Sequence, residues 1–325
     1  MAANYFLQTT IAIVWDFDNT LIPGYMQEPL FRRYGVEGRA EDGKSGFWDE
    51  VNALQSHYLA RGLGHCSQDV LYLQHILTYV REGRFPDLTN AMLRELGAEI
   101  QFYPGVLELM EALTRRPTEV IVEGATTEAT VEHYVVSTGL REMILGSGVA
   151  PLVRDVWACE FVDVVAPPGF LSTRTADPPP GPIMQVGYSI DNTTKTRAIF
   201  EINKGVNVNP QIDVNSPMKP EHRRVPFQNI IYVADGPSDV PVFSVVGLWK
   251  GRTFAVYKPG DPKHFTQAKL LQDEGRVHGY GPADYQAGTQ TAMWLTATVD
   301  EMIVRITQER AAALAGLIGH VPSHL

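Results

Sequence analysis

Short apolar runs that end abruptly in polar residues recur along this chain. Three segments, at residues 11–15, 131–136 and 230–234, predict core strands. The first and the third are continuous apolar runs, typical of strands that are buried on both faces, as in a parallel sheet. Further strands are expected over residues 253–257 and 292–296. The polar residues after the first three segments are Asp16, Asp18 and Thr20, then Ser137, Thr138 and Gly139, and finally Asp235 and Asp239. Because the carboxyl ends of parallel strands meet at one edge, we expect these side chains to gather there.

Helical periodicity fills the interval between the first two predicted strands. Three segments there have apolar residues at steps of three and four, namely residues 47–59, 70–80 and 87–97. No strand-like run interrupts them. We therefore predict an all-helical domain over residues 25–97, inserted into a core domain made of residues 1–24 and 98–325.

The rest of the chain alternates strands with helices. Helices are predicted at residues 102–113, 192–205 and 299–317. Strands at residues 156–165 and 183–188 flank a Pro-rich loop, residues 166–182, and predict a projecting β-hairpin. Alternating strands and helices indicate parallel βαβ units, so the predicted fold class is α/β with a Rossmann-like parallel sheet.

Composition excludes several classes of protein. The formal net charge of −10 argues against a protein that binds nucleic acid through bulk basicity. The two cysteines, Cys66 and Cys159, cannot form a disulfide framework or a cysteine zinc site. No apolar run is long enough for a membrane helix, and we expect neither membrane association nor a signal peptide. We expect a cytoplasmic protein; its oligomeric state is not predicted.

The pair Asp16 and Asp18 suggests metal chemistry. Two carboxylates this close repel each other unless a cation or a proton lies between them. Oxygen ligands at this density suit Mg²⁺, which prefers one or two carboxylates together with water and a substrate phosphate. The alternative is a strand that simply ends in a polar turn.

The motif Asp16-x-Asp18-x-Thr20 after an apolar strand resembles the first motif of the haloacid-dehalogenase superfamily. Ser137, Lys195 and the pair Asp235 and Asp239 resemble that family's other motifs, in order. The resemblance covers roughly residues 10–25 and 100–260 and implies a haloacid-dehalogenase-like core. The helical insertion resembles the cap of the phosphoserine-phosphatase-like branch.

The resemblance implies roles for the acidic residues. Asp16 would be the nucleophile that forms an aspartyl-phosphate, and Asp18 would be the general acid and base. Mg²⁺ would be bound by Asp16, Asp18, Asp235 and Asp239. For Asp18 this contact would come from the backbone carbonyl, although a side-chain contact is an alternative. Asp239 would contact the metal directly or through water, and it could also cap the following helix.

It also implies a phosphate-binding set. Thr20, Ser137 and Lys195 would hold the phosphoryl group, together with the backbone N–H groups of Thr138 and Gly139. Ser137 could instead be a plain helix cap. Lys195 stands out because a cation in the first turn of a helix opposes the helix dipole.

The expected function is a Mg²⁺-dependent phosphatase of a small phosphorylated metabolite, with phosphoserine-like monoesters as the first candidates. An acid at position 18 favours phosphate chemistry over dehalogenation, because a halide leaves without a proton. Two alternatives are a phosphotransferase or mutase of the same superfamily and a non-catalytic metabolite-binding protein on this fold.

Overall fold

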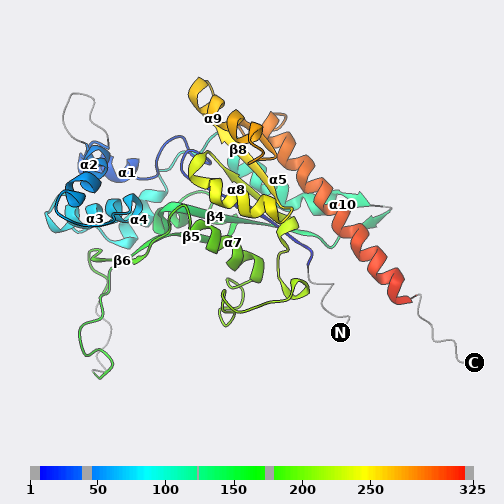
Figure 1. Cartoon of the computed structure of the whole chain (residues 1–325), viewed down its shortest axis with the longest axis horizontal. Coiled ribbons are helices and arrows are strands. Elements are labelled where there is room, and N and C mark those ends of the chain that lie inside the picture. The colour runs from blue at the N-terminus through cyan, green and yellow to red at the C-terminus, as the bar shows by residue number, and fades with distance from the viewer. Residues whose placement is uncertain (1–7, 39–45, 123, 173–178, 319–325) are drawn as a thin grey trace, which may run out of the picture.

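The structure, a computed structural model, describes residues 8–38, 46–122, 124–172 and 179–318 and is built around one seven-stranded sheet (Figure 1). The strand order is β6-β5-β4-β1-β7-β8-β9. The strands are β1 (Thr10–Trp15), β4 (Thr130–Leu140), β5 (Val153–Val162), β6 (Gln185–Tyr188), β7 (Ile230–Ala234), β8 (Arg252–Tyr257) and β9 (Gly279–Pro282). Every neighbouring pair is parallel except β5 and β6, which are antiparallel. The predicted parallel sheet is therefore confirmed.

The central strand β1 is buried along its whole length. Trp15, its last residue, lies beside Val135 of β4 and Val233 of β7. Because the three strands run in parallel, the residues that follow them emerge at the same edge of the sheet. This register explains how motifs more than 100 residues apart reach one site.

Four helices follow β1 and form a body beside the sheet (Figure 1). They are α1 (Glu28–Tyr34), α2 (Phe47–Leu59), α3 (Gln68–Arg81) and α4 (Asn90–Gly97). No strand occurs among the described residues of this insertion, as predicted from its periodicity. The fold class, a parallel α/β core with an inserted helical region, is thereby confirmed, whereas the domain boundaries at residues 25 and 97 stay predictions.

Six further helices belong to the sheet-bearing part of the chain. They are α5 (Val106–Glu119), α6 (Arg141–Gly146), α7 (Lys195–Lys204), α8 (Val240–Leu248), α9 (Pro262–Asp273) and α10 (Gln290–Ile318). A small antiparallel hairpin, β2 (Ile121–Val122) with β3 (Ala125–Thr126), follows α5. The helices predicted at residues 102–113 and 192–205 correspond to α5 and α7.

The strand predicted at residues 292–296 is wrong, because this segment lies inside helix α10. Ala292, Leu295 and Val299 are buried at helical spacing, and a short apolar run alone cannot separate a strand from a helix. The last strand is instead β9, whose sequence contains two glycines and lacks the expected apolar run. A Cβ on Gly281 would lie 2.5 Å from Thr291 Oγ1, so close packing of α10 on β9 requires glycine there.

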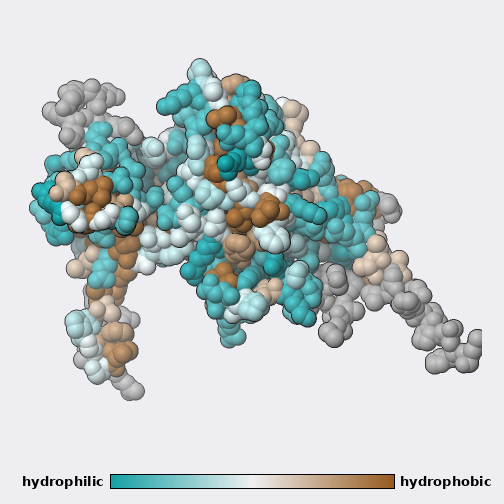
Figure 2. All heavy atoms as spheres, viewed as in Figure 1, coloured by the Kyte–Doolittle hydropathy of each residue, from teal (hydrophilic) through white to brown (hydrophobic). Residues whose placement is uncertain are grey.

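The predicted hairpin of β5 and β6 is confirmed by their antiparallel pairing. Both strands belong to the main sheet, and the described part of the loop between them projects as an arm below the helical insertion (Figure 1). Residues 173–178 of this Pro-rich loop lie outside the described residues. Figure 2 shows a largely hydrophilic face, with apolar residues on this arm, where Phe170 and Leu171 are exposed.

No helix in the described ranges combines the length and apolar character needed to cross a membrane.

Candidate active site

Three carboxylates meet where β1 and β7 end. The backbone N–H of Asp16 donates to Val233 O at 2.9 Å, which continues the pairing of the two strands. Asp235 follows β7 directly, and Asp239 directly precedes helix α8. One oxygen atom from each of these three carboxylates lies within 4.8 Å of the others. The structure thus brings together three of the four predicted metal ligands.

Lys195 lies between two of these carboxylates. Its Nζ donates to Asp16 Oδ1 at 2.8 Å and to Asp239 Oδ1 at 2.7 Å, and the side chain is only 2% exposed. Burial lowers the pKa of Lys195, but attraction by Asp16 and Asp239 outweighs burial and raises the pKa overall. The ammonium group is therefore charged at neutral pH and is aimed at the predicted nucleophile.

The placement of Lys195 follows from the turn before it. Lys195 is the first residue of α7, and its N–H donates to Asp191 O at 2.9 Å. The Asp191 side chain accepts hydrogen bonds from the N–H groups of Thr193 and Thr194, which fixes this turn. Lys204, at the other end of α7, donates to the carbonyls of Val214 and Ser216 and has a structural role.

Asp239 is held by its neighbours. Tyr232 OH donates to Asp239 Oδ1 at 2.6 Å, and Ser238 Oγ donates to Oδ2 at 2.9 Å. Its carboxylate accepts no hydrogen bond from the N–H groups of α8, so the predicted capping role is not observed. The arrangement orients Asp239 toward Lys195.

Asp235 differs from Asp239 because its carboxylate accepts no hydrogen bond within the described part of the chain. Burial, and then the charges of Asp16 and Asp239, raise the pKa of Asp235 well above its ordinary value. Asp16 shares one oxygen with Lys195 and accepts a hydrogen bond from Thr20 Oγ1 at 3.0 Å on the other. An all-oxygen donor set in which one carboxylate receives no hydrogen bond from the protein fits Mg²⁺.

Asp18 lies outside this group of three carboxylates. Its Oδ1 accepts a hydrogen bond from Met26 N at 2.9 Å, and the side chain borders a cavity. Burial, and then the charge of Asp16, raise the pKa of Asp18 to about 8. A raised pKa suits a general acid, which must hold its proton until the leaving group takes it.

The turn after Asp18 depends on Asn19. Its φ of 57° is in the left-handed region, which Asn tolerates better than most residues. Asn19 also pairs with Gly24 in both directions: Asn19 N donates to Gly24 O, and Gly24 N donates to Asn19 Oδ1. The turn directs the chain from the strand end into the helical insertion.

The predicted phosphate-binding residues of β4 lie at the same edge of the sheet. Ser137 is buried, and its Oγ accepts a hydrogen bond from Gly139 N at 3.0 Å, which leaves the hydroxyl proton for another acceptor. The Thr138 carbonyl accepts from Tyr72 OH of α3 at 2.5 Å. Phosphate binding by Ser137, Thr138 and Gly139 stays a prediction.

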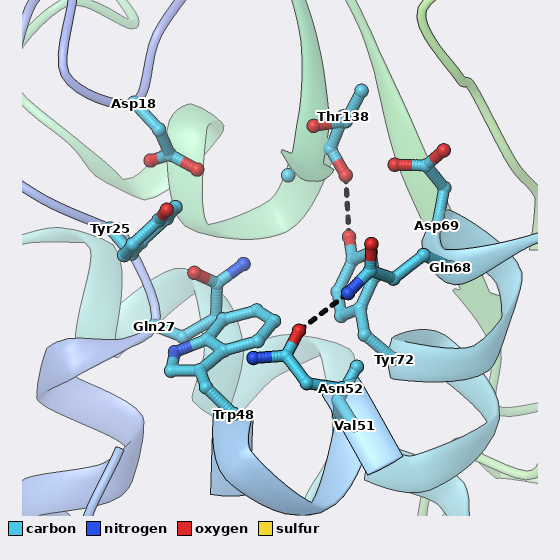
Figure 3. A pocket seen from close by; sticks show the side chains of 11 residues that line it. Asp18, Tyr25, Gln27, Trp48, Val51, Asn52, Gln68, Asp69, Tyr72 and Thr138 are labelled. Carbon is cyan, nitrogen blue, oxygen red and sulfur yellow. Dashed lines mark hydrogen bonds between the residues drawn. The ribbon is translucent and has the colours of Figure 1, made fainter. Parts of the chain in front are cut away.

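A cavity of about 220 Å³ opens beside Asp18, Thr138 and Gly139 (Figure 3). Its other walls come from α2, α3 and the segment before α1. The sequence did not identify these wall residues, because Trp48, Val51 and Asn52 have the spacing of an ordinary helix face. Five arginines of the insertion do not line the cavity, namely Arg32, Arg33, Arg61, Arg81 and Arg84, and Lys44 lies outside the described residues.

Comparisons with known proteins give one clear relative in sequence. An uncharacterized protein of Borreliella burgdorferi is 39% identical over 292 residues, which cover 89% of this chain and 96% of that protein. No protein-family model matches the sequence.

Solved structures with a similar fold include hydrolases. A HAD family hydrolase from Salmonella enterica serovar Typhi is 12% identical, with a TM-score of 0.48, and covers 84% of this chain and 66% of that one. A phosphoserine phosphatase with an analogue of its phospho-aspartyl intermediate is 14% identical, with a TM-score of 0.46, and covers 89% of this chain and 99% of that one. Within this chain itself, the motifs lie at the sheet edge where the sequence resemblance to the haloacid-dehalogenase superfamily requires them.

Proposed function

We propose that this chain, which belongs to one family with the uncharacterized protein of Borreliella burgdorferi, is a Mg²⁺-dependent phosphatase of a small phosphorylated metabolite. One observation carries the proposal. The buried ammonium group of Lys195 bridges Asp16 and Asp239, with Asp235 adjacent, at the carboxyl ends of two central strands. Such a site combines a carboxylate nucleophile with fixed positive charge for a transferring phosphoryl group.

The residues fit Mg²⁺. Asp16, Asp235 and Asp239 would hold the ion with their carboxylates, and Asp18 with its backbone carbonyl. When bound, the ion supplies positive charge that neutralises the phosphoryl oxygens and reduces their repulsion with the nucleophile.

The reaction has two displacements. An Asp16 oxygen attacks phosphorus, the bond from phosphorus to the ester oxygen breaks, and Asp18 gives its proton to the leaving alkoxide. A water molecule then attacks the aspartyl-phosphate, Asp18 takes a proton from this water, and phosphate leaves. Lys195 stabilises the phosphoryl charge in both steps, and Thr20 orients Asp16 through its hydroxyl.

Hydrolysis of 4-nitrophenyl phosphate in Mg²⁺ and in EDTA, by the wild type and Asp16→Asn, tests the proposal. We expect Mg²⁺-dependent turnover that Asp16→Asn reduces at least a thousandfold, because the amide is not a nucleophile. The fold should survive, since an amide at position 16 can still accept from Lys195 and pair with Thr20. Circular dichroism checks this.

Asp273→Asn is the matched control, because it removes the same charge from an exposed helix position, where the carboxylate pairs with Lys269. Activity that persists in Asp16→Asn and in EDTA would contradict the proposed chemistry. Transfer of the phosphoryl group to an added alcohol, without release of inorganic phosphate, would assign a phosphotransferase. Absence of turnover with any ester would leave a metabolite-binding protein.

A further inference from the structure

We propose that the cavity beside Asp18 recognises a protonated amine on the leaving group of the substrate, so that the substrate is a phosphate ester of an amino alcohol without a second anionic group. This inference rests on the proposed function and names its substrate class. It departs from the phosphoserine-like esters suggested by the branch resemblance, because those carry a carboxylate as well.

The position of the cavity defines what it binds. The phosphoryl group must lie at Asp16 and Lys195, and the ester oxygen must lie within reach of Asp18, its proton donor. Asp18 is itself part of the cavity wall (Figure 3). The remainder of the leaving group therefore extends from Asp18 into the cavity.

The charge of the wall selects against anions. Asp18 and Asp69 are the only acidic residues that line the cavity in the described part of the chain, and no lysine, arginine or histidine lines it. Burial, and then the charge of Asp191, raise the pKa of Asp69, so that a bound cation would relieve an unfavourable carboxylate. A carboxylate on the leaving group would meet two acids and no cation.

Three aromatic residues line the same space (Figure 3). Tyr25, Trp48 and Tyr72 form one continuous wall, with ring centroids 5.4 Å apart for Tyr25 and Trp48 and 5.7 Å apart for Trp48 and Tyr72. The hydrogen bond from Tyr72 OH to the Thr138 carbonyl fixes the Tyr72 ring. Ring faces around a small space attract cations, and ammonium groups are recognised in this way.

A buried acceptor without a partner points to the same ligand. Gln27 is only 2% exposed, and its Oε1 has no hydrogen-bond donor among the described residues. Its amide lies among the aromatic rings of the cavity wall (Figure 3). Because an unsatisfied buried acceptor is costly, a ligand N–H group at this position is favourable.

Three esters on one frame test the inference. Phosphoethanolamine, 2-hydroxyethyl phosphate and phosphoglycolate present an ammonium, a hydroxyl and a carboxylate at about the same distance from phosphorus. We expect kcat/KM for phosphoethanolamine to exceed that for the hydroxyl ester at least tenfold, with the carboxylate ester lowest. Equal values for the first two, or a preference for phosphoglycolate, would overturn the inference while leaving the phosphatase intact.

Asp69→Asn tests whether the Asp69 carboxylate causes the preference for the ammonium ester. We expect it to reduce the advantage of the ammonium ester over the hydroxyl ester at least fivefold. Glu95→Gln, which removes one charge from an exposed position of α4 away from the cavity, is the matched control. An unchanged preference in Asp69→Asn would contradict the assignment.

If no ester is hydrolysed, binding still tests the cavity. Titration of ethylammonium chloride should change the tryptophan fluorescence of the wild type, whereas sodium chloride at equal ionic strength should not. The change should be lost in Trp48→Phe and weakened in Asp69→Asn. No response in the wild type would overturn the inference independently of turnover.

Discussion

Lys195 shows how one side chain can reveal a site from sequence. A cation in the first turn of a helix is electrostatically unfavourable, and this conflict was the reason to expect another use for it. The structure supplies that use, because Asp16 and Asp239 both accept hydrogen bonds from its ammonium group. The attraction between the ammonium group and two hydrogen-bonded carboxylates is stronger than its repulsion from the positive end of the helix dipole.

Asp18 has a role that leaving-group chemistry can isolate. 4-Nitrophenolate leaves without a proton, whereas the alkoxide of an alkyl ester requires one. In Asp18→Asn we therefore expect a rapid burst of about one equivalent of 4-nitrophenol per enzyme, followed by slow turnover, because only the second step needs Asp18. Stopped-flow absorbance measures the burst.

Alkyl phosphates should show slow turnover without a burst in the same variant. The wild type, assayed alongside, provides the reference rate for both ester types. A burst-free, uniformly slow reaction with 4-nitrophenyl phosphate would mean that Asp18 acts in the first step even without proton transfer.

The residues of the cavity wall could not be predicted from the sequence. Trp48 and Tyr72 have the helical spacing of core residues, and Gln27 belongs to no recognisable motif. Their common feature is spatial, since α2, α3 and the segment before α1 face one another only after folding. The spacing of residues within one helix does not show which other segments that helix will face in the folded protein.

Among the elements, helices α4 and α6 make close backbone contact between the insertion and the core. A Cβ on Gly146 would lie 1.8 Å from Arg94 O, and one on Gly97 would lie 2.1 Å from Met143 O. Two glycines thus allow the helices to touch. The contact joins the last helix of the insertion firmly to the core.

Gly146→Ala should destabilise the protein by about 1–3 kcal/mol, because the added methyl group forces the two backbones apart. Urea unfolding measures the change. Gly64→Ala is the control, since a Cβ there meets no atom within 4 Å and its φ is not positive. Equal stability of the two variants would contradict the close contact.

The fold was predictable where an element has a strong pattern. Strands β1 and β7 contain continuous apolar runs, β4 contains the shorter run Tyr134-Val-Val before its polar end, and the helices of the insertion have clear periodicity. Strand β9 shows no such pattern. Its glycines are needed for the close packing of α10, and they give no apolar run that would predict a strand. The acidic side chains of the site could be predicted because they directly follow the strands with the strongest patterns.

At the scale of the whole molecule, His133 links the centre of the sheet to its helical cover. Trp15 Nε1 donates to His133 Nδ1 at 3.1 Å, and His133 Nε2 donates to the Met110 carbonyl of α5 at 2.9 Å. Burial lowers the pKa of His133 from 6.5 to about 4. The folded protein therefore holds this imidazole in its neutral form.

The stability of the protein should fall as the pH falls from 6.5 toward 4. Above pH 6.5 His133 is neutral in both states, whereas below it the unfolded chain binds a proton that the folded protein does not. The loss from this group amounts to about 3 kcal/mol in full. Urea unfolding at pH 7.5 and 4.5 measures it.

His133→Gln separates this effect from the titration of the carboxylates. Glutamine can accept from Trp15 and donate to Met110, but it does not titrate, so the variant should lose less stability between the two pH values. An identical loss in the wild type and the variant would show that His133 does not titrate on unfolding.

The order of β1 and β7 in the sequence also affects how the protein folds during translation. Residues 10–15 leave the ribosome before β7, which covers one edge of β1 and is translated about 200 residues later. Until then the nascent chain presents an apolar strand with an unpaired edge, which favours aggregation. Chaperones that bind extended apolar segments should therefore hold the growing chain until Ile230–Ala234 emerges and pairs with it.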